Sequence, residues 1–122
     1  VFCKRFTSKE EKRRLQCGIY NPKDFEQYGF IATQNKINYI ERIDGMEMDL
    51  DTTYGVYALL NSTLFDIYYR ILNGSTQVNS TEINRIPIPP LRLISKIGGQ
   101  LRETNDLSTD NCDRIVMEVA YA

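Results

Sequence analysis

Apolar side chains recur every three or four residues through the middle of the chain, which is the spacing of one face of an α-helix. The polar triplet Asn61-Ser62-Thr63 interrupts this stripe, and Thr63 and Asp66 have the spacing of a capping box. We therefore expect two consecutive helices or one kinked helix. Asn73-Gly74 is typical of the left-handed end of a helix. The residues of the stripe are Tyr54, Tyr57, Leu60, Leu64, Tyr68 and Ile71.

The first third of the chain has the short β-branched and aromatic runs that are typical of strands. Asn21-Pro22 predicts a turn after the second run, and residues 34–36 form the polar tip of a predicted hairpin. These runs predict a small, mostly antiparallel sheet. The predicted strands cover residues 1–6, 16–20, 28–33 and 37–42.

The last third of the chain returns to helical spacing after an extended segment. Pro87, Pro89 and Pro90 cannot donate to a β-ladder and disfavour helix in the residues before them, so residues 77–88 are predicted to be extended. The complete pattern predicts an α+β fold, with a small, mostly antiparallel sheet packed against three to four helices. A further helix is predicted from the spacing of Leu91, Ile94, Ile97 and Leu101, although Gly98-Gly99 weakens it. Residues 105–111 are predicted to be a polar linker. The last predicted element covers residues 112–121, and helix is favoured over strand there.

Length and composition limit the class of protein. A chain of 122 residues with 42% hydrophobic and 25% charged side chains fits one globular core and excludes two domains or a disordered chain. Its apolar runs, such as Val56–Leu60, are far shorter than the ~20 residues of a membrane span, so we expect a soluble protein with no membrane partner. Because it begins at Val1 without a signal-peptide pattern, we expect a piece of a longer protein.

The residue types exclude several kinds of site. Cys3, Cys17 and Cys112 are an odd number without CxxC spacing, and the chain has no histidine, so neither a disulfide framework nor a zinc site is predicted. We expect the three thiols to be free and buried, in a protein of the reducing cytoplasm. With no histidine, no paired-acid arrangement and no glycine-rich phosphate loop, the sequence does not favour an independent enzyme.

Three alternating acids, Glu47, Asp49 and Asp51, could hold a hard cation. The calcium-loop pattern fails here because Thr52 stands where its glycine should be. Acids just before a helix also favour its positive dipole end without any metal. No metal site is therefore predicted.

Positive charge is concentrated near the beginning of the chain. Residues 1–42 hold nine basic and five acidic side chains, although the whole chain has a net charge of −1. Six of these basic side chains lie within residues 4–14, which we call the basic tract. Such a cluster can neutralise DNA phosphates without reading sequence. A solvated loop, with Glu10 and Glu11 pairing locally, explains the tract equally well. Ser8 and Glu11 have the spacing of a capping box, so a short helical turn competes with a plain loop here. The cations of this tract, predicted to lie in solvent from residue 7 onward, are Lys4, Arg5, Lys9, Lys12, Arg13 and Arg14.

A second candidate lies at residues 73–81, which are rich in amides and hydroxyls. Asn and Gln can bind adenine with two hydrogen bonds, and Thr suits a phosphate or a base. In the alternative interpretation, one Asn caps a helix and the rest satisfy loop backbone. The candidates for positioning or base readout are Asn73, Thr76, Gln77 and Asn79.

Several runs of this sequence, in order over residues 2–97, resemble the C-terminal specificity region of TaqI-like adenine-specific DNA methyltransferases of restriction-modification systems. These runs are residues 4–14, Asn35-Lys36-Ile37-Asn38-Tyr39-Ile40, Leu59-Leu60-Asn61-Ser62-Thr63-Leu64-Phe65-Asp66, residues 73–82 and Ile86-Pro87-Ile88-Pro89-Pro90.

The resemblance implies a target recognition domain fragment over residues 1–104, followed by a linker and C-terminal element over 105–122. Its partners would be duplex DNA and a catalytic domain of the same chain, which binds S-adenosylmethionine and methylates a flipped adenine. Asn21-Pro22-Lys23-Asp24 departs from the family's Asn-Pro-Pro-Tyr motif at two places, and Pro89-Pro90 lacks its first and last residues. We therefore expect no catalysis and no cofactor in this fragment.

Two other hypotheses stay open at the level of sequence. A protein-docking module would join the methylase to a partner subunit through an exposed face of Tyr54, Tyr57 and Tyr68. A small metal-dependent enzyme would use the acids between residues 47 and 51.

Overall fold

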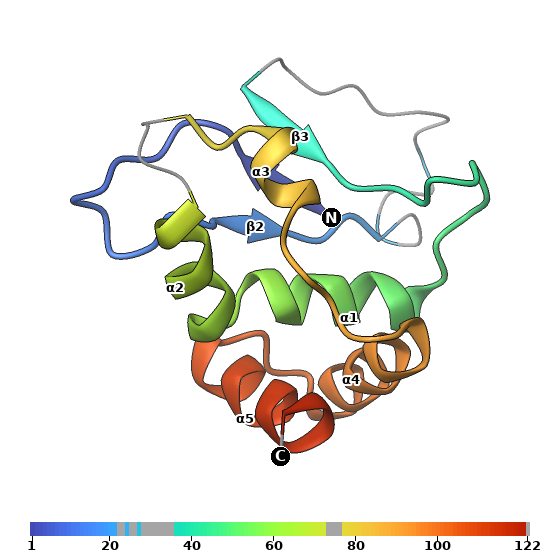
Figure 1. Ribbon diagram of the computed structural model, residues 1–122. Coiled ribbons are helices and arrows are strands. Elements are labelled where there is room, and N and C mark those ends of the chain that lie inside the picture. Colours follow the sequence, from blue (N-terminus) through green and yellow to red (C-terminus); the bar gives the residue numbers. More distant parts are fainter. Residues whose placement is uncertain (22–23, 25–26, 28–35, 73–76, 122) are drawn as a thin grey trace.

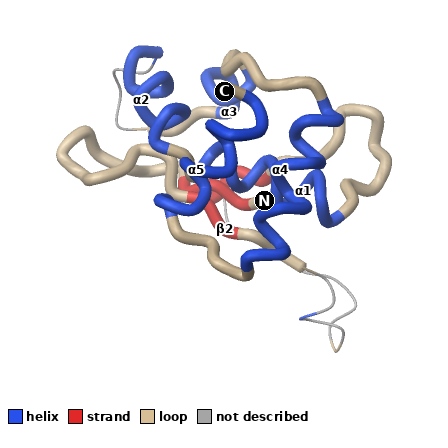
Figure 2. The backbone as a smooth tube through the Cα atoms, turned by 90° about the horizontal axis from the view of Figure 1, so that it is seen from below, coloured by secondary structure: helices blue, strands red, loops and turns tan. Residues whose placement is uncertain are grey.

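The computed structural model describes residues 1–121 except 22–23, 25–26, 28–35 and 73–76, and it confirms the α+β fold. The described residues form five helices instead of the predicted three to four. Helix α1 lies in the middle, with the small sheet and α3 on one side and α4 and α5 on the other (Figure 1). Seen from the side of α4 and α5, the strands lie behind the helices (Figure 2). The elements are β1 (Phe2–Lys4), β2 (Cys17–Gly18), β3 (Ile37–Tyr39), α1 (Leu50–Leu60), α2 (Thr63–Leu72), α3 (Ser80–Asn84), α4 (Leu91–Thr104) and α5 (Thr109–Ala120).

The sheet has the strand order β2-β1-β3, and both pairings are antiparallel. Cys3 in the central strand lies opposite Cys17 on one side and Asn38 on the other. Each described strand falls within a predicted strand, but each is shorter than predicted. The predicted strand over residues 28–33 and most of the hairpin tip lie outside the described residues.

The chain turns between α1 and α2 at the predicted triplet, and two separate helices form. At the end of α1 the Asn61 N–H donates to the Tyr57 carbonyl. At the start of α2 the Ser62 hydroxyl accepts a hydrogen bond from the Phe65 N–H at 3.3 Å. The predicted capping box of Thr63 and Asp66 is wrong. The Thr63 N–H and hydroxyl instead donate to the Asp113 carboxylate of α5, both at 2.6 Å.

The predicted apolar stripe is correct for α1 and wrong for α2. Tyr57 and Leu60 are buried, whereas Leu64 and Ile71 are 42% and 77% exposed. The turn between the helices changes the direction of the chain, so a stripe drawn through both as one helix does not remain on one face. In α2 the buried side chains are Phe65, Asp66 and Tyr69.

Helices α1 and α4 cross at a point where both have glycine. A Cβ atom on Gly98 would lie 1.6 Å from the Asp51 carbonyl oxygen, and one on Gly55 would lie 1.9 Å from the Ile94 carbonyl oxygen. Gly98, which weakens α4 as an isolated helix, therefore allows the backbones of α1 and α4 to pack closely. Ile94, Ile97 and Leu101 of α4 are buried, as the spacing predicts.

Residues 77–88 contain a short helix, α3, so the prediction of a fully extended segment is wrong. Proline restricts the residue directly before it, and this effect does not reach back from residue 87 to Ser80–Asn84. The last element is the favoured helix, α5, whose Cys112, Ile115 and Val116 are buried. None of the described helices combines the length and the apolar composition that a membrane crossing requires.

Candidate nucleic-acid interface

The two segments predicted to contact DNA lie side by side. The Arg5 N–H donates to the Lys36 carbonyl at 2.9 Å, and the Val78 N–H donates to the Arg5 carbonyl at 2.6 Å. Phe6 and Gln77 form an isolated antiparallel bridge. The basic tract is therefore held between the start of β3 and residues 77–78, which are distant in sequence.

Residues 7–14 form a closed loop, which we call the basic loop. The Thr7 hydroxyl donates to the Arg14 carbonyl at 2.9 Å and accepts from Arg14 Nε at 3.0 Å. The Ser8 N–H donates to the Glu11 carboxylate at 2.8 Å, so half of the predicted capping box forms, in a turn instead of a helix. Both Thr7 and Arg14 are buried, so the prediction that the whole loop lies in solvent is wrong at its two ends.

Helix α2 holds the basic loop through Asp66 and Arg70, neither of which was predicted as a site residue. Asp66, only 5% exposed, accepts hydrogen bonds from the Arg14 and Leu15 N–H groups at 2.9 and 2.7 Å. Arg70 pairs with Asp66 at 3.1 Å and donates to the Lys9, Glu11 and Lys12 carbonyls. The spacing of Asp66 and Arg70, four residues apart on one helix, was the available sequence signal.

The three arginines among the six predicted phosphate-binding cations have side-chain contacts within the protein. The Arg14 side chain is fully buried and lies over the Tyr69 ring at 5.7 Å, so its charge is not presented to solvent. Arg13 donates to the Leu15, Leu60 and Ser62 carbonyls at 3.1–3.2 Å. The carbonyl oxygens at the end of α1 carry partial negative charge, which favours a cation there.

The remaining lysines are exposed. Lys4 ends β1, and Lys9 and Lys12 lie in the basic loop at the far left of the fold (Figure 1). Lys36, which was not predicted as a site residue, is exposed beside Arg5. Within the described part of the chain, none of these four lysines forms an ion pair, so their charge is presented to solvent.

Arg5 and Gln77 form a pair at the junction of the two segments. With its amide oriented to satisfy both groups, the Gln77 carbonyl oxygen accepts from Arg5 Nη2 at 2.9 Å and from Nε at 3.0 Å. The guanidinium also lies 5.9 Å from the centre of the Phe6 ring. Gln77 therefore fixes the orientation of a half-buried arginine.

Asn79 lies two residues beyond Gln77, directly before α3. Its side chain makes no capping hydrogen bond to that helix. Next to it a shallow groove runs between β3 and α3, and Asn38 fixes this arrangement by donating to the Val78 carbonyl at 2.7 Å. The other two predicted residues of this segment, Asn73 and Thr76, lie outside the described residues. The groove is lined by Asn38, Tyr39, Ile40, Glu41, Ser80, Ile83 and Asn84.

Two of the three acids considered for metal, Asp49 and Asp51, have contacts within the protein, and Glu47 is exposed. The Asp49 carboxylate caps α1 by accepting from the Thr52 N–H at 2.7 Å, and this hydrogen bond lowers the pKa of Asp49. Asp51 forms an ion pair with Arg102 at 2.7 Å. Among the described residues, no three His, Cys, Asp or Glu side chains form a group that could hold a metal ion.

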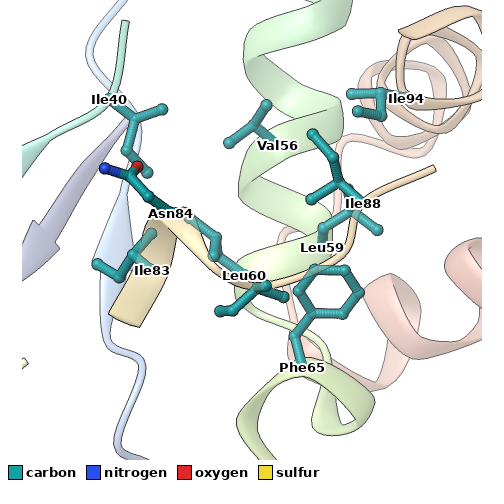
Figure 3. A pocket seen from close by; sticks show the side chains of 10 residues that line it. Ile40, Val56, Leu59, Leu60, Phe65, Ile83, Asn84, Ile88 and Ile94 are labelled. Carbon is teal, nitrogen blue, oxygen red and sulfur yellow. The ribbon is translucent and has the colours of Figure 1, made fainter. Parts of the chain in front are cut away.

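An apolar pocket lies between α1, α3 and the segment that leads to α4 (Figure 3). Leu59, Phe65 and Ile88 lie together on one side, and Ile40, Ile83 and Asn84 lie on the other. Asn84 provides the only side-chain amide among its lining residues, and none of them is titratable. The pocket can accept an apolar group but offers no acid, base or nucleophile.

Two known proteins are similar to this chain. It is 39% identical over 101 residues to the type II methyltransferase M.PstI of Providencia stuartii, and 38% identical over 100 residues to the type II methyltransferase M.BsuBI of Bacillus subtilis. The chain resembles a segment of type II methyltransferases. The expected relation to methyltransferases is thereby confirmed.

The similarity covers most of this chain and a small part of each relative. The two matches include 83% and 80% of this chain but 20% and 19% of the relatives, so the chain spans about a fifth of their length. No protein-family model and no solved structure matches it.

Proposed function

We propose that this chain is a noncatalytic DNA target-recognition segment of an adenine-specific methyltransferase of a restriction-modification system. It would bind duplex DNA for a catalytic domain of the same protein, in the cytoplasm. The observation that carries this proposal is the bridge between Phe6 and Gln77, which joins the basic tract to the polar segment on one face. The similarity to type II methyltransferases supports it independently.

The exposed lysines are assigned to the DNA backbone. Lys4, Lys9, Lys12 and Lys36 lie on segments that hydrogen bonds hold together, and phosphate contacts of this kind position a protein without reading sequence. Each such contact releases counterions, so affinity falls with salt. Arg13 and Arg14 are assigned to the stability of the basic loop and not to DNA.

Arg5 and Asn79 are assigned to base readout beside these lysines, and Gln77 is assigned to the positioning of Arg5. Arginine with two hydrogen bonds to guanine is the commonest specific contact in the major groove, and Gln and Asn suit adenine. Gln77 holds the guanidinium of Arg5, so less side-chain freedom is lost when Arg5 binds. Asn73 and Thr76 remain candidates from the sequence.

The methyl transfer itself is assigned to the rest of the parent protein, with S-adenosylmethionine as donor. The adjacent glycines Gly98 and Gly99 lie inside α4, and Gly98 packs against the backbone of α1, so this pair is no phosphate-binding loop. No residue of this chain is therefore assigned to the transfer step.

The test is the salt dependence of binding to a labelled duplex, measured by fluorescence anisotropy. The double variant Lys9→Ala/Lys12→Ala should reduce the slope of log K against log salt by about 2, because each phosphate contact contributes about 0.9. The matched control, Arg92→Ala/Lys96→Ala, removes the same charge from α4, which lies away from the basic loop in both views (Figures 1 and 2). Equal slopes for the two variants would contradict the proposal.

A docking role is the second candidate, and an apolar face of α2 favours it. Leu64, Ile67 and Ile71 are 42%, 55% and 77% exposed. The tyrosine face first considered for docking does not serve, because Tyr57 is buried and its hydroxyl donates to the Leu107 carbonyl at 3.1 Å. Ile67→Glu/Ile71→Glu in the full-length parent should weaken subunit association in sedimentation if α2 docks, and leave it unchanged if it does not.

A further inference from the structure

We propose that Cys3 and Cys17 are a modification site, a cross-strand thiol pair that two-electron oxidants such as glutathione disulfide convert to a disulfide. Their Sγ atoms are 3.0 Å apart, and both thiols are free in this structure. This inference does not depend on the proposed function.

The backbone places these two thiols in the right register. Cys3 and Cys17 are directly opposite each other in the antiparallel pair of β1 and β2. The Lys4 N–H donates to the Gln16 carbonyl at 2.8 Å, which marks Cys3 and Cys17 as a non-hydrogen-bonded pair. Cα atoms in such pairs are about 4.5 Å apart, inside the range of about 4.4–6.8 Å that a disulfide spans. The bond can therefore form without a change of strand pairing.

The chemistry proceeds by two thiolate exchanges. Cys17 is half-buried and Cys3 is fully buried, so the Cys17 thiolate attacks glutathione disulfide and releases one glutathione thiolate. The Cys3 thiolate then attacks the Cys17 sulfur and releases the second, and the two thiol protons pass to the departing glutathiones. The hydrogen bond from Cys17 lowers the pKa of Cys3, which favours the second step, and raises the pKa of Cys17, which slows the first.

The third cysteine is a natural internal control. Cys112 lies buried on α5, on the other side of α1 from the sheet (Figure 1). Its Sγ is contacted by Asn61 Nδ2 at 3.7 Å and not by either of the other thiols. A Cys3–Cys17 bond would enclose residues 4–16, and hence the basic loop, within a covalent ring.

The experiment equilibrates the Cys112→Ser variant in glutathione redox buffers, with and without urea, followed by acid quenching and mass spectrometry. We expect loss of two hydrogens and one linked tryptic peptide containing residues 1–4 and 15–23. Two thiols on a short flexible chain have an effective concentration in the millimolar range, and the native register should raise this by about tenfold or more over the value in urea.

Two outcomes would overturn the proposal. One is an effective concentration in the native protein that does not exceed the value in urea. The other is a glutathione adduct on Cys17 that does not close to the disulfide. The variants Cys17→Ser and Cys17→Val, which keep Cys3 and Cys112, should stay reduced in the same buffers. Equal disulfide formation in either folded variant would also contradict the specific pairing.

Discussion

Asp66 joins three parts of the molecule although its side chain is almost fully buried. Its carboxylate accepts two backbone N–H groups from the end of the basic loop and pairs with Arg70 on its own helix. A buried carboxylate with three such partners stabilises the fold, because its loss leaves two buried N–H groups without an acceptor.

Replacing Asp66 with alanine should therefore be strongly destabilising. We expect Asp66→Ala to lower the free energy of unfolding by about 3 kcal/mol, measured by urea denaturation. Asp44→Ala is the control, because Asp44 pairs with Arg42 in solvent, and its midpoint should not change. A midpoint for Asp66→Ala equal to that of the control would refute this role.

The arginines of the basic tract show what sequence can and cannot predict about a single cation. The density of positive charge was visible at once, but the partners of each side chain were not. Arg14 is buried because its guanidinium donates to Thr7, which the closed loop brings close to it, and packs over Tyr69, which is distant along the chain. The number of basic residues in the sequence therefore overestimated how many cations residues 4–14 present to solvent.

Among the elements, helices were predictable wherever a local signal existed. The break at residues 61–63 and the helical spacing of α4 and α5 depend on neighbours in sequence. The orientation of α2 and the helix α3 depend on packing against distant segments, such as the contact of Thr63 with Asp113. Periodicity carries no information about such contacts.

The crossing of α1 and α4 depends on Gly98 and not on its neighbour. A Cβ atom at Gly98 would overlap the α1 backbone, whereas one at Gly99 would come no closer than 3.8 Å to the Asp51 carboxylate. We expect Gly98→Ala to destabilise the protein by about 3 kcal/mol, like other severe overpacking of a core, and Gly99→Ala to stabilise it by about 0.5–1 kcal/mol through helix propensity. Thermal unfolding monitored by circular dichroism measures both, and similar melting temperatures would contradict this packing.

The cap of α1 makes a small, pH-dependent contribution. The hydrogen bond from Thr52 lowers the pKa of Asp49 in the folded state, so its charge stabilises the protein above the unfolded pKa of about 3.9. This contribution is lost as the pH falls through the lower, folded pKa. Asp49→Asn keeps a capping oxygen without the charge. The variant should be about 0.5 kcal/mol less stable at pH 7 and equal to the parent sequence near pH 2. A difference that stays constant between these pH values in urea titrations would exclude the charge effect.

At the scale of the whole molecule, α1 lies between two layers of the fold (Figure 1). The sheet, the basic loop and residues 77–79 form the side that carries Lys4, Lys9, Lys12 and Lys36, whereas α4 and α5 form the other side (Figure 1). The relation to type II methyltransferases and this grouping support the same role, in which the chain holds DNA. The sequence predicted both segments of this face but gave no sign that they adjoin, because a bridge between residues 6 and 77 depends on the complete fold.

The most direct test of that role is an NMR titration of the isotopically labelled chain with duplex DNA at low salt. The account predicts that the amide signals of residues 4–12, 36–38 and 77–79 shift together and return when salt is raised, while those of α4 do not move. Shifts confined to α4, α5 or the exposed face of α2, or no shifts at all, would contradict it.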